Sequence, residues 1–86
     1  MPIVSIFLGI VIKIFHEDHN PPHFHVEYGD FKALIEIKTG KIIQGRLPKR
    51  ISRLVEEWRT LNEFAIQQSW KLAQTGKNPK RIKPLE

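Results

Sequence analysis

The sequence contains no cysteine, which excludes disulfide bridges and thiolate metal sites. It also has no hydrophobic run long enough to cross a membrane. A transmembrane helix needs roughly 20 apolar residues, and the apolar segment 3–15 is interrupted by Lys13. A secretory leader would need a basic start and a small-residue cleavage site, and neither is visible. These absences predict a cytoplasmic protein with no membrane segment, in which residues 3–15 form buried sheet.

Three familiar functional patterns are absent as well: a glycine-rich phosphate loop, a Ser-His-Asp arrangement and a helix-turn-helix. What is present fits one small folded domain, because 86 residues with a 41% hydrophobic share can form a single core. Positive charge is concentrated in the second half: residues 1–45 have a net charge of −1 and residues 46–86 a net charge of +6. Such an excess indicates an anionic partner, or else simply solvated helix and tail side chains.

The first half of the chain predicts a sheet of four to five short antiparallel strands within residues 3–44. Apolar and polar residues alternate from His23 to Tyr28, with Gly29-Asp30 as a hairpin turn. Phe24 and Val26 then occupy the buried face, and His23, His25 and Glu27 the solvent face. Gly9 marks either a bulge in one long strand or a break between two short ones.

The second half predicts one long helix over about residues 48–75, packed on one face of the sheet and burying Trp58 against Phe24. Apolar residues recur at helical spacing, and Gly76 fits a position just past the helix end. After Asn62 the apolar stripe is less regular, so either the helix bends or its second half is a two-sided docking surface. The expected class is therefore α+β: one domain, residues 1–86, with sheet over 1–45, helix over 46–76 and a basic tail over 77–86, pinned by Ile82 and Leu85.

Histidines are clustered in the segment His19-Asn-Pro-Pro-His23-Phe-His25. His23 and His25 are two apart on a strand, so both rings project from the same face and can share one metal ion. His19, on the preceding loop, is the third candidate ligand, and Asp18 can orient an imidazole. These residue types suit a divalent transition metal such as zinc.

Two other interpretations of the histidines stay open. His23 and His25 can act as a general acid and base in phosphodiester cleavage, with Arg46 or Lys41 stabilising the phosphate charge. Alternatively, the histidines supply only the polar face that any alternating strand needs. A separate candidate is an anion site formed by Lys49, Arg50 and Arg53 at the predicted helix start, where the helix dipole favours negative charge.

The chain resembles a family of short bacterial proteins, the domain of unknown function 4160. The resemblance spans most of the chain, and the Pro-Pro-His-Phe-His core is its specific part. Residues 62–66 depart from the family pattern, where a more acidic, leucine-rich turn is expected. The matching elements are Phe7-x-Gly9-Ile-x-Ile, His19-x-Pro-Pro-His-Phe-His25-x-x-Tyr28-Gly29, Gly45-x-Leu-Pro48, Trp58, Trp70 and Ile82-x-Pro84-Leu85.

The resemblance implies a small stand-alone cytoplasmic domain associated with toxin–antitoxin-like gene pairs, and it implies no reaction or cofactor. Together with the basic second half, it leads to the expectation of a binding module that contacts nucleic acid or a small partner protein. The alternative is an enzyme centred on the histidines, either metal-dependent or of the acid–base type.

Overall fold

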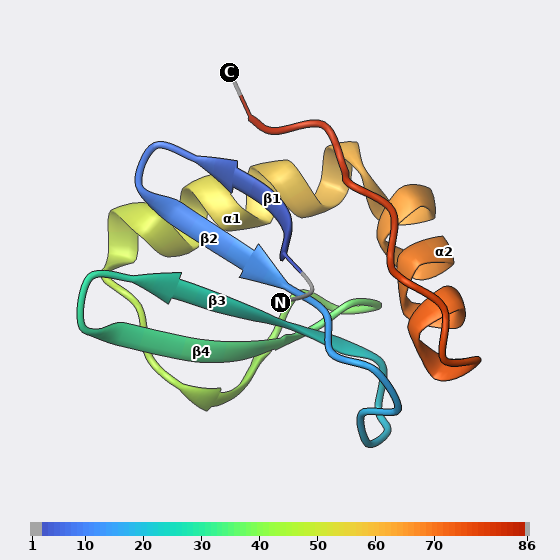
Figure 1. Ribbon diagram of the computed structural model, residues 1–86. Helices are drawn as coiled ribbons and strands as arrows, with labels where there is room; N and C mark the ends of the chain where they lie inside the picture. The colour runs from blue at the N-terminus through green and yellow to red at the C-terminus, as the bar shows by residue number, and fades with distance from the viewer. Residues whose placement is uncertain (1–2, 86) are drawn as a thin grey trace.

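The computed structural model describes residues 3–85 and consists of a five-stranded antiparallel sheet with two helices (Figure 1). The strands follow one another in space in chain order, so each pairs with its neighbour in the sequence. In the view of Figure 1, α1 lies behind the sheet and α2 stands at its right-hand end. The elements are β1 (Ile3–Phe7), β2 (Ile10–Lys13), β3 (His23–Tyr28), β4 (Phe31–Glu36), β5 (Ile42–Gly45), α1 (Lys49–Leu61) and α2 (Glu63–Gln74).

Tight turns set the first and third connections of this sheet. Leu8 and Gly9 both have positive φ angles, of 50° and 80°, which suits the two-residue turns that join antiparallel strands. Gly9 therefore marks a break between two short strands and not a bulge in one long strand. Gly29, with a φ angle of 56°, begins the predicted turn between β3 and β4. The prediction of an α+β fold with four to five short antiparallel strands is confirmed, and the sheet has five.

The core lies between the sheet and α1. Trp58 of α1 is fully buried and contacts Phe24 edge-on, with 5.5 Å between ring centroids, as well as Phe7 at 5.8 Å. Its indole N–H donates to the carbonyl of Lys83 at 3.0 Å, so this ring also has its polar atom satisfied. The predicted contact between Trp58 and Phe24 is confirmed.

The prediction of one long C-terminal helix is wrong, because the helix breaks at Asn62. Asn62 has φ −128° and ψ 23°, outside the helical region, and its side-chain amide donates to the carbonyl of Trp58 at 2.9 Å. Its side chain thus satisfies a carbonyl that the interrupted helix leaves free. The break turns α2 so that Ile66 and Trp70 are buried, which explains the irregular apolar stripe. Only Phe64 of this stripe is strongly exposed, at 73%.

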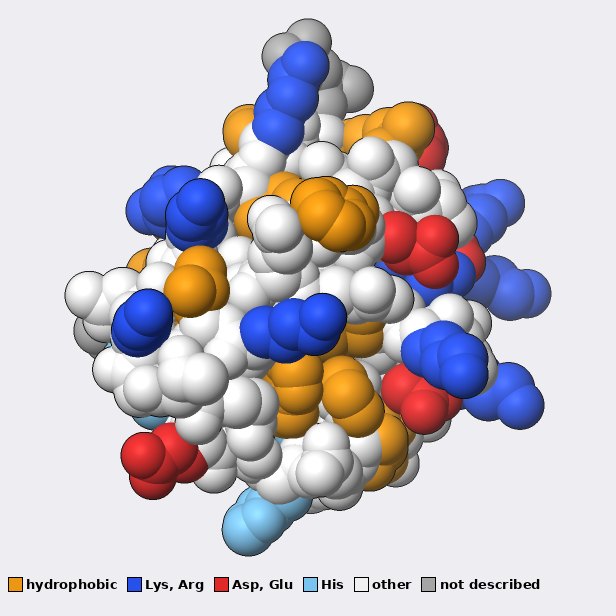
Figure 2. All heavy atoms as spheres, turned by 90° about the vertical axis from the view of Figure 1, so that its right-hand side faces the viewer, with side chains coloured by type: hydrophobic (Ala, Val, Ile, Leu, Met, Phe, Trp, Pro, Cys, Tyr) orange, Lys and Arg blue, Asp and Glu red, His pale blue; other side chains and the backbone are white. Residues whose placement is uncertain are grey.

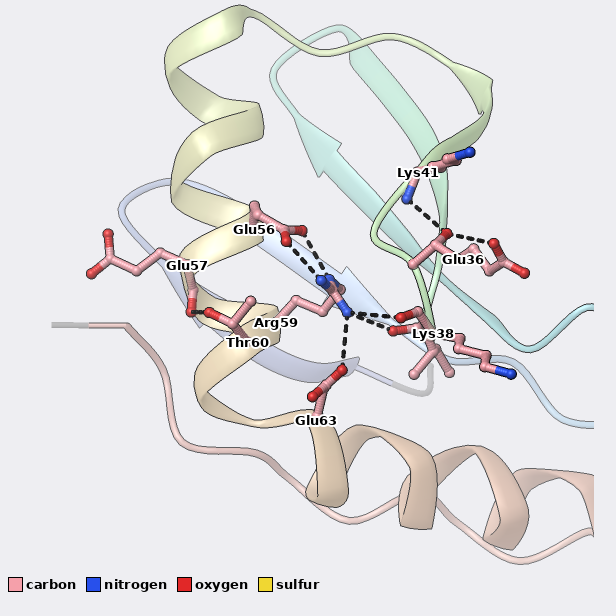
Figure 3. A network of polar contacts seen from close by, with 10 residues as sticks. Glu36, Lys38, Lys41, Glu56, Glu57, Arg59, Thr60 and Glu63 are labelled. Carbon is pink, nitrogen blue, oxygen red and sulfur yellow. Dashed lines mark hydrogen bonds and ion pairs between the residues drawn. The ribbon is translucent and has the colours of Figure 1, made fainter.

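A buried guanidinium joins the two helices to the sheet (Figure 3). Arg59, only 6% exposed, donates to the carbonyl of Ile37 at 2.9 Å and to both carboxylate oxygens of Glu56 at 2.6 and 2.8 Å. It also reaches Glu63, the first residue of α2, at 3.3 Å. Arg59 therefore links the residues after β4 with α1 and with the start of α2.

The tail is held as the sequence predicts. The backbone N–H of Gly76, at a φ of 79°, donates to Ala73, and the N–H of Lys77 donates to Leu72, which closes the end of α2 as a glycine cap does. The tail then returns along the sheet, where Ile82 and Leu85 are buried. Neither helix in the described residues is long and apolar enough to cross a membrane.

Candidate metal centre

The connection between β2 and β3 brings Asp18 next to two histidines of β3. This loop is fixed to the end of α2 at two points: the Glu17 N–H donates to the carbonyl of Ala73 at 3.2 Å, and the Gln74 amide donates to the carbonyl of Asp18 at 3.0 Å. The histidine side chains come from the first and third residues of β3, so they share one face of the strand. Helix α2 thus positions the carboxylate, and the sheet positions the imidazoles.

One carboxylate oxygen lies between the two rings. The Oδ2 atom of Asp18 is 3.0 Å from Nε2 of His23 and 2.9 Å from Nε2 of His25. One potential ligand atom from each of the three residues lies within 4.8 Å of the others. Two imidazole nitrogens and a carboxylate oxygen therefore converge on one point.

His23 is buried, contrary to the prediction that it faces solvent. It is 6% exposed, because the loop lies over it and Trp70 of α2 packs against it with 5.4 Å between ring centroids. Its Nδ1 atom is 2.8 Å from the carbonyl oxygen of Pro21. Because a carbonyl oxygen only accepts hydrogen bonds, Nδ1 carries a proton, and Nε2 is the nitrogen that faces Asp18.

His25 is the more accessible of the two rings. Its side chain is 24% exposed, and it contacts Phe15 edge-on at 4.4 Å between centroids. It also borders a groove of about 400 Å³ over β3, β4 and β5, together with Lys32 and Gln44. The site therefore has one buried ring and one ring that opens toward solvent.

The charge of Asp18 is favoured by its neighbours. Burial raises the pKa of this carboxyl, but the hydrogen bond from His25, the backbone N–H of His19 and the charges of His23 and His25 together lower it below its usual value. Asp18 is therefore a carboxylate at neutral pH. An ionised carboxylate beside two imidazoles is a ligand set for divalent transition metals.

The set of converging residues differs in one member from the sequence-based metal site. His23 and His25 come together as predicted, but the third group is the side chain of Asp18. His19 is exposed and contributes its backbone N–H to Oδ1 of Asp18 at 2.9 Å. Sequence reasoning assigned Asp18 only an orienting role, because nothing in a loop without periodicity shows which side chain turns inward. Glu27, the fifth residue of β3, pairs with Lys13 of β2 at 3.0 Å and is not part of this set.

The predicted anion site lies elsewhere. Lys49, Arg50 and Arg53 are exposed at the start of α1, which is at the opposite end of the sheet from the β2–β3 loop (Figure 1). Figure 2 looks onto the side where α2 stands and shows Lys and Arg side chains spread over this face. One hollow of about 360 Å³ is lined by three lysines of α2 and the tail, Lys71, Lys77 and Lys80. Gln68, Leu72 and Thr75 complete its lining.

Comparison with known proteins places the chain in a family. Residues 9–71 match the family described as Domain of unknown function (DUF4160). The protein belongs to the DUF4160 family. The match includes the β2–β3 loop and the histidines of β3, so the candidate metal centre of this DUF4160 protein lies within the family region. No curated protein and no solved structure matches the chain.

Proposed function

We propose that this DUF4160 protein binds a divalent transition metal ion through Asp18, His23 and His25. The observation that carries the proposal is the hydrogen bond from Nδ1 of His23 to the Pro21 carbonyl. With its proton on Nδ1, a neutral ring has a lone pair at Nε2, 3.0 Å from an ionised carboxylate. Two lone pairs at this distance repel, so the buried site requires a positive charge, either a second ring proton or a metal ion.

The tautomer of His23 is also the one that metal-bound histidines adopt. A ligating imidazole usually donates its other ring N–H to a backbone carbonyl or carboxylate, which fixes the ring orientation. The Pro21 carbonyl plays this part here. Trp70, packed against the same ring, restricts its rotation. The site therefore has a ligand nitrogen that is already oriented.

The distances allow a metal ion after a local rearrangement of the three side chains. In a tetrahedral zinc site with bonds of roughly 2.0–2.1 Å, neighbouring ligand atoms lie roughly 3.3–3.4 Å apart. The carboxylate oxygen of Asp18 is 2.9–3.0 Å from the two nitrogens, and the three potential ligand atoms lie within 4.8 Å of one another. To hold the ion, the carboxylate oxygen moves outward by a few tenths of an ångström and the two rings close by up to about 1.4 Å.

Three protein ligands leave at least one coordination position for water or another ligand, as in catalytic rather than structural zinc sites. The partial exposure of the His25 and Asp18 side chains, 24% and 19%, gives that position access to solvent. A metal-dependent hydrolytic activity is therefore better supported than a metal-free acid–base pair. In the metal-free site both ring nitrogens of His23 face protein oxygens, and none is left for a substrate.

Titration of tag-free protein with Zn²⁺, followed by calorimetry and elemental analysis, tests the proposal. We expect one ion per chain for the wild type. Asp18→Asn and His23→Gln each weaken binding by about 100-fold or more, since each removes a ligand. The exposed His16→Gln is the matched control and His19→Gln tests the alternative ligand set; we expect both to bind within about threefold of the wild type. Unchanged affinity in Asp18→Asn and His23→Gln contradicts the proposal.

A second candidate function is contact with nucleic acid, favoured by the hollow that Lys71, Lys77 and Lys80 line. If each lysine neutralises one phosphate, replacing all three by glutamine lowers the slope of log affinity against log salt by about 2 for a single strand. The same replacement of Lys49, Arg50 and Arg53 tests the site predicted from the sequence. A slope that neither triple variant changes excludes both surfaces.

A further inference from the structure

The two edges of the sheet differ in how they are covered. At the β1 edge the tail returns alongside the strand, with the Ile82 N–H donating to the carbonyl of Val4 at 2.7 Å. Ile82 and Leu85 are buried there, at 5% and 9% exposure. The other edge is β5, and all four of its residues are exposed. Among the residues that the structure describes, no helix or strand lies on the outer side of β5, the short yellow-green arrow at the bottom of Figure 1.

The side chains of β5 make this edge unusual. An uncovered edge strand offers free backbone N–H and C=O groups, and proteins usually protect it with charged or proline residues, with a β-bulge or by keeping it short. β5 has four residues and a bulge at Ile43, because Ile42 stands opposite Ile35 and Gln44 opposite Leu34. It contains no charged residue or proline, and its two consecutive isoleucines, Ile42 and Ile43, are 42% and 47% exposed, so the edge is apolar at the bulge. The strand is therefore equipped to pair with another strand.

Positive charges flank the strand. Lys41 precedes β5 and Arg46 follows it, and both are exposed. In residues 3–85 neither has an ion-pair partner; Arg46 contacts the ring face of Phe31, with its guanidinium carbon 5.9 Å from the centroid. Lys38, on the turn before β5, is exposed as well. An incoming strand with acidic ends meets complementary charge at both ends of β5.

The same charges disfavour a second copy of this chain as the partner. When two copies of β5 pair antiparallel about a two-fold axis with residues 42–45 aligned, Lys41 of each copy stands opposite Arg46 of the other. Like charges directly opposite each other destabilise a strand pair. The symmetric dimer therefore has repulsion at both ends, whereas an acidic strand has attraction at both ends.

We propose that β5 is a docking edge for an extended, acidic segment of a partner protein, which adds a sixth strand to the sheet. Main-chain hydrogen bonds to β5 provide affinity, and contacts of apolar side chains with Ile42 and Ile43 provide specificity, as in other cases of strand addition. The acidic residues at its ends pair with Lys41 and Arg46. This contact is independent of the metal centre.

The test uses the full chain and a defined probe: a ten-residue peptide of alternating valine and threonine with two glutamates at each end. Its counterpart has lysines in place of the glutamates. We expect the acidic peptide to shift and protect the backbone amides of residues 42–46 in NMR spectra. We also expect it to bind at least tenfold more tightly than the basic peptide at low salt.

Two variants localise the effect. Ile43→Asp adds a repelling charge at the edge and is expected to weaken binding of the acidic peptide at least tenfold. Leu61→Asp, at a more exposed apolar residue of α1 (70%), is the control and should bind within about twofold of the wild type. Circular dichroism and thermal unfolding confirm that both are folded. Lys41→Glu with Arg46→Glu should reverse the preference, so that the basic peptide binds more tightly.

Four results would overturn the proposal. The first is that the acidic peptide causes no shifts at residues 42–46. The second is equal affinity for both peptides, and the third is a wild-type dimer that Ile43→Asp dissociates. The fourth is that a single-stranded RNA oligonucleotide shifts these amides and the acidic peptide does not.

Discussion

Replacement of Arg59 by methionine is expected to lower the stability of the protein strongly. Methionine keeps the apolar stem and removes the guanidinium, so the buried carbonyl of Ile37 loses its donor. An unsatisfied buried acceptor costs about 1–3 kcal/mol, and each half-exposed pair with Glu56 or Glu63 adds roughly 0.2–1 kcal/mol. The expected loss is about 3 kcal/mol, which for a domain of this size lowers Tm by roughly 10–25 °C.

Urea denaturation of Arg59→Met and the wild type measures this loss. Glu63→Gln is the control, because Glu63 is 51% exposed and its pair with Arg59 is the longer one; its loss should stay below about 1 kcal/mol. A loss below 1 kcal/mol for Arg59→Met itself would refute the conclusion that this guanidinium joins α1 and α2 to the sheet.

Three further predictions concern single positions. The pKa of Asp18 is lowered on folding, so the stability that this carboxylate contributes is present above its unfolded pKa and is lost as the pH falls through its folded pKa. When the free energy of unfolding is measured at decreasing pH, Asp18→Asn should therefore lose less of it below about pH 4 than the wild type does. A Cβ at Gly45 would lie 2.1 Å from the carbonyl oxygen of Lys32, so Gly45→Ala should lower Tm clearly more than Gly76→Ala, where the space is open and the φ angle similar. Within residues 3–85 the buried hydroxyl of Ser5 has no hydrogen-bond partner, so Ser5→Ala should raise stability by up to about 1 kcal/mol; a lower Tm would show that the hydroxyl is satisfied.

Much of the sheet is predictable from local chemistry. Gly9 and Gly29 mark turns because they tolerate positive φ angles, and alternation in His23–Tyr28 and Phe31–Glu36 gives each residue its face. Pairing of consecutive strands then follows from short connections. The tail contacts of Ile82 and Leu85 follow from two apolar residues in a basic segment.

The helix break is less predictable, because periodicity alone continues through Asn62 with only a change of stripe. Asparagine is tolerated in helices at a modest cost. The helix ends at Asn62 because of tertiary packing: Ile66 and Trp70 are buried only when α2 turns toward the β2–β3 loop. The sequence indicates a change there but does not give its direction.

The candidate site was predictable in its histidines but not in its geometry. Strand alternation places His23 and His25 on one face. The burial of His23, however, depends on Trp70, which is distant in the sequence, and on the β2–β3 loop, which has no regular pattern. The inward turn of Asp18 depends on the hydrogen bond from Gln74, a contact across 56 residues. Only the folded chain brings these groups together.

Crystals of tag-free protein soaked with Zn²⁺, with anomalous data collected at the zinc edge, test the central proposal most directly. We predict one anomalous peak per chain, roughly 2.0–2.1 Å from Nε2 of His23, Nε2 of His25 and a carboxylate oxygen of Asp18. A zinc ion bound only at exposed residues such as His19, or no peak between the two rings of β3, would contradict it.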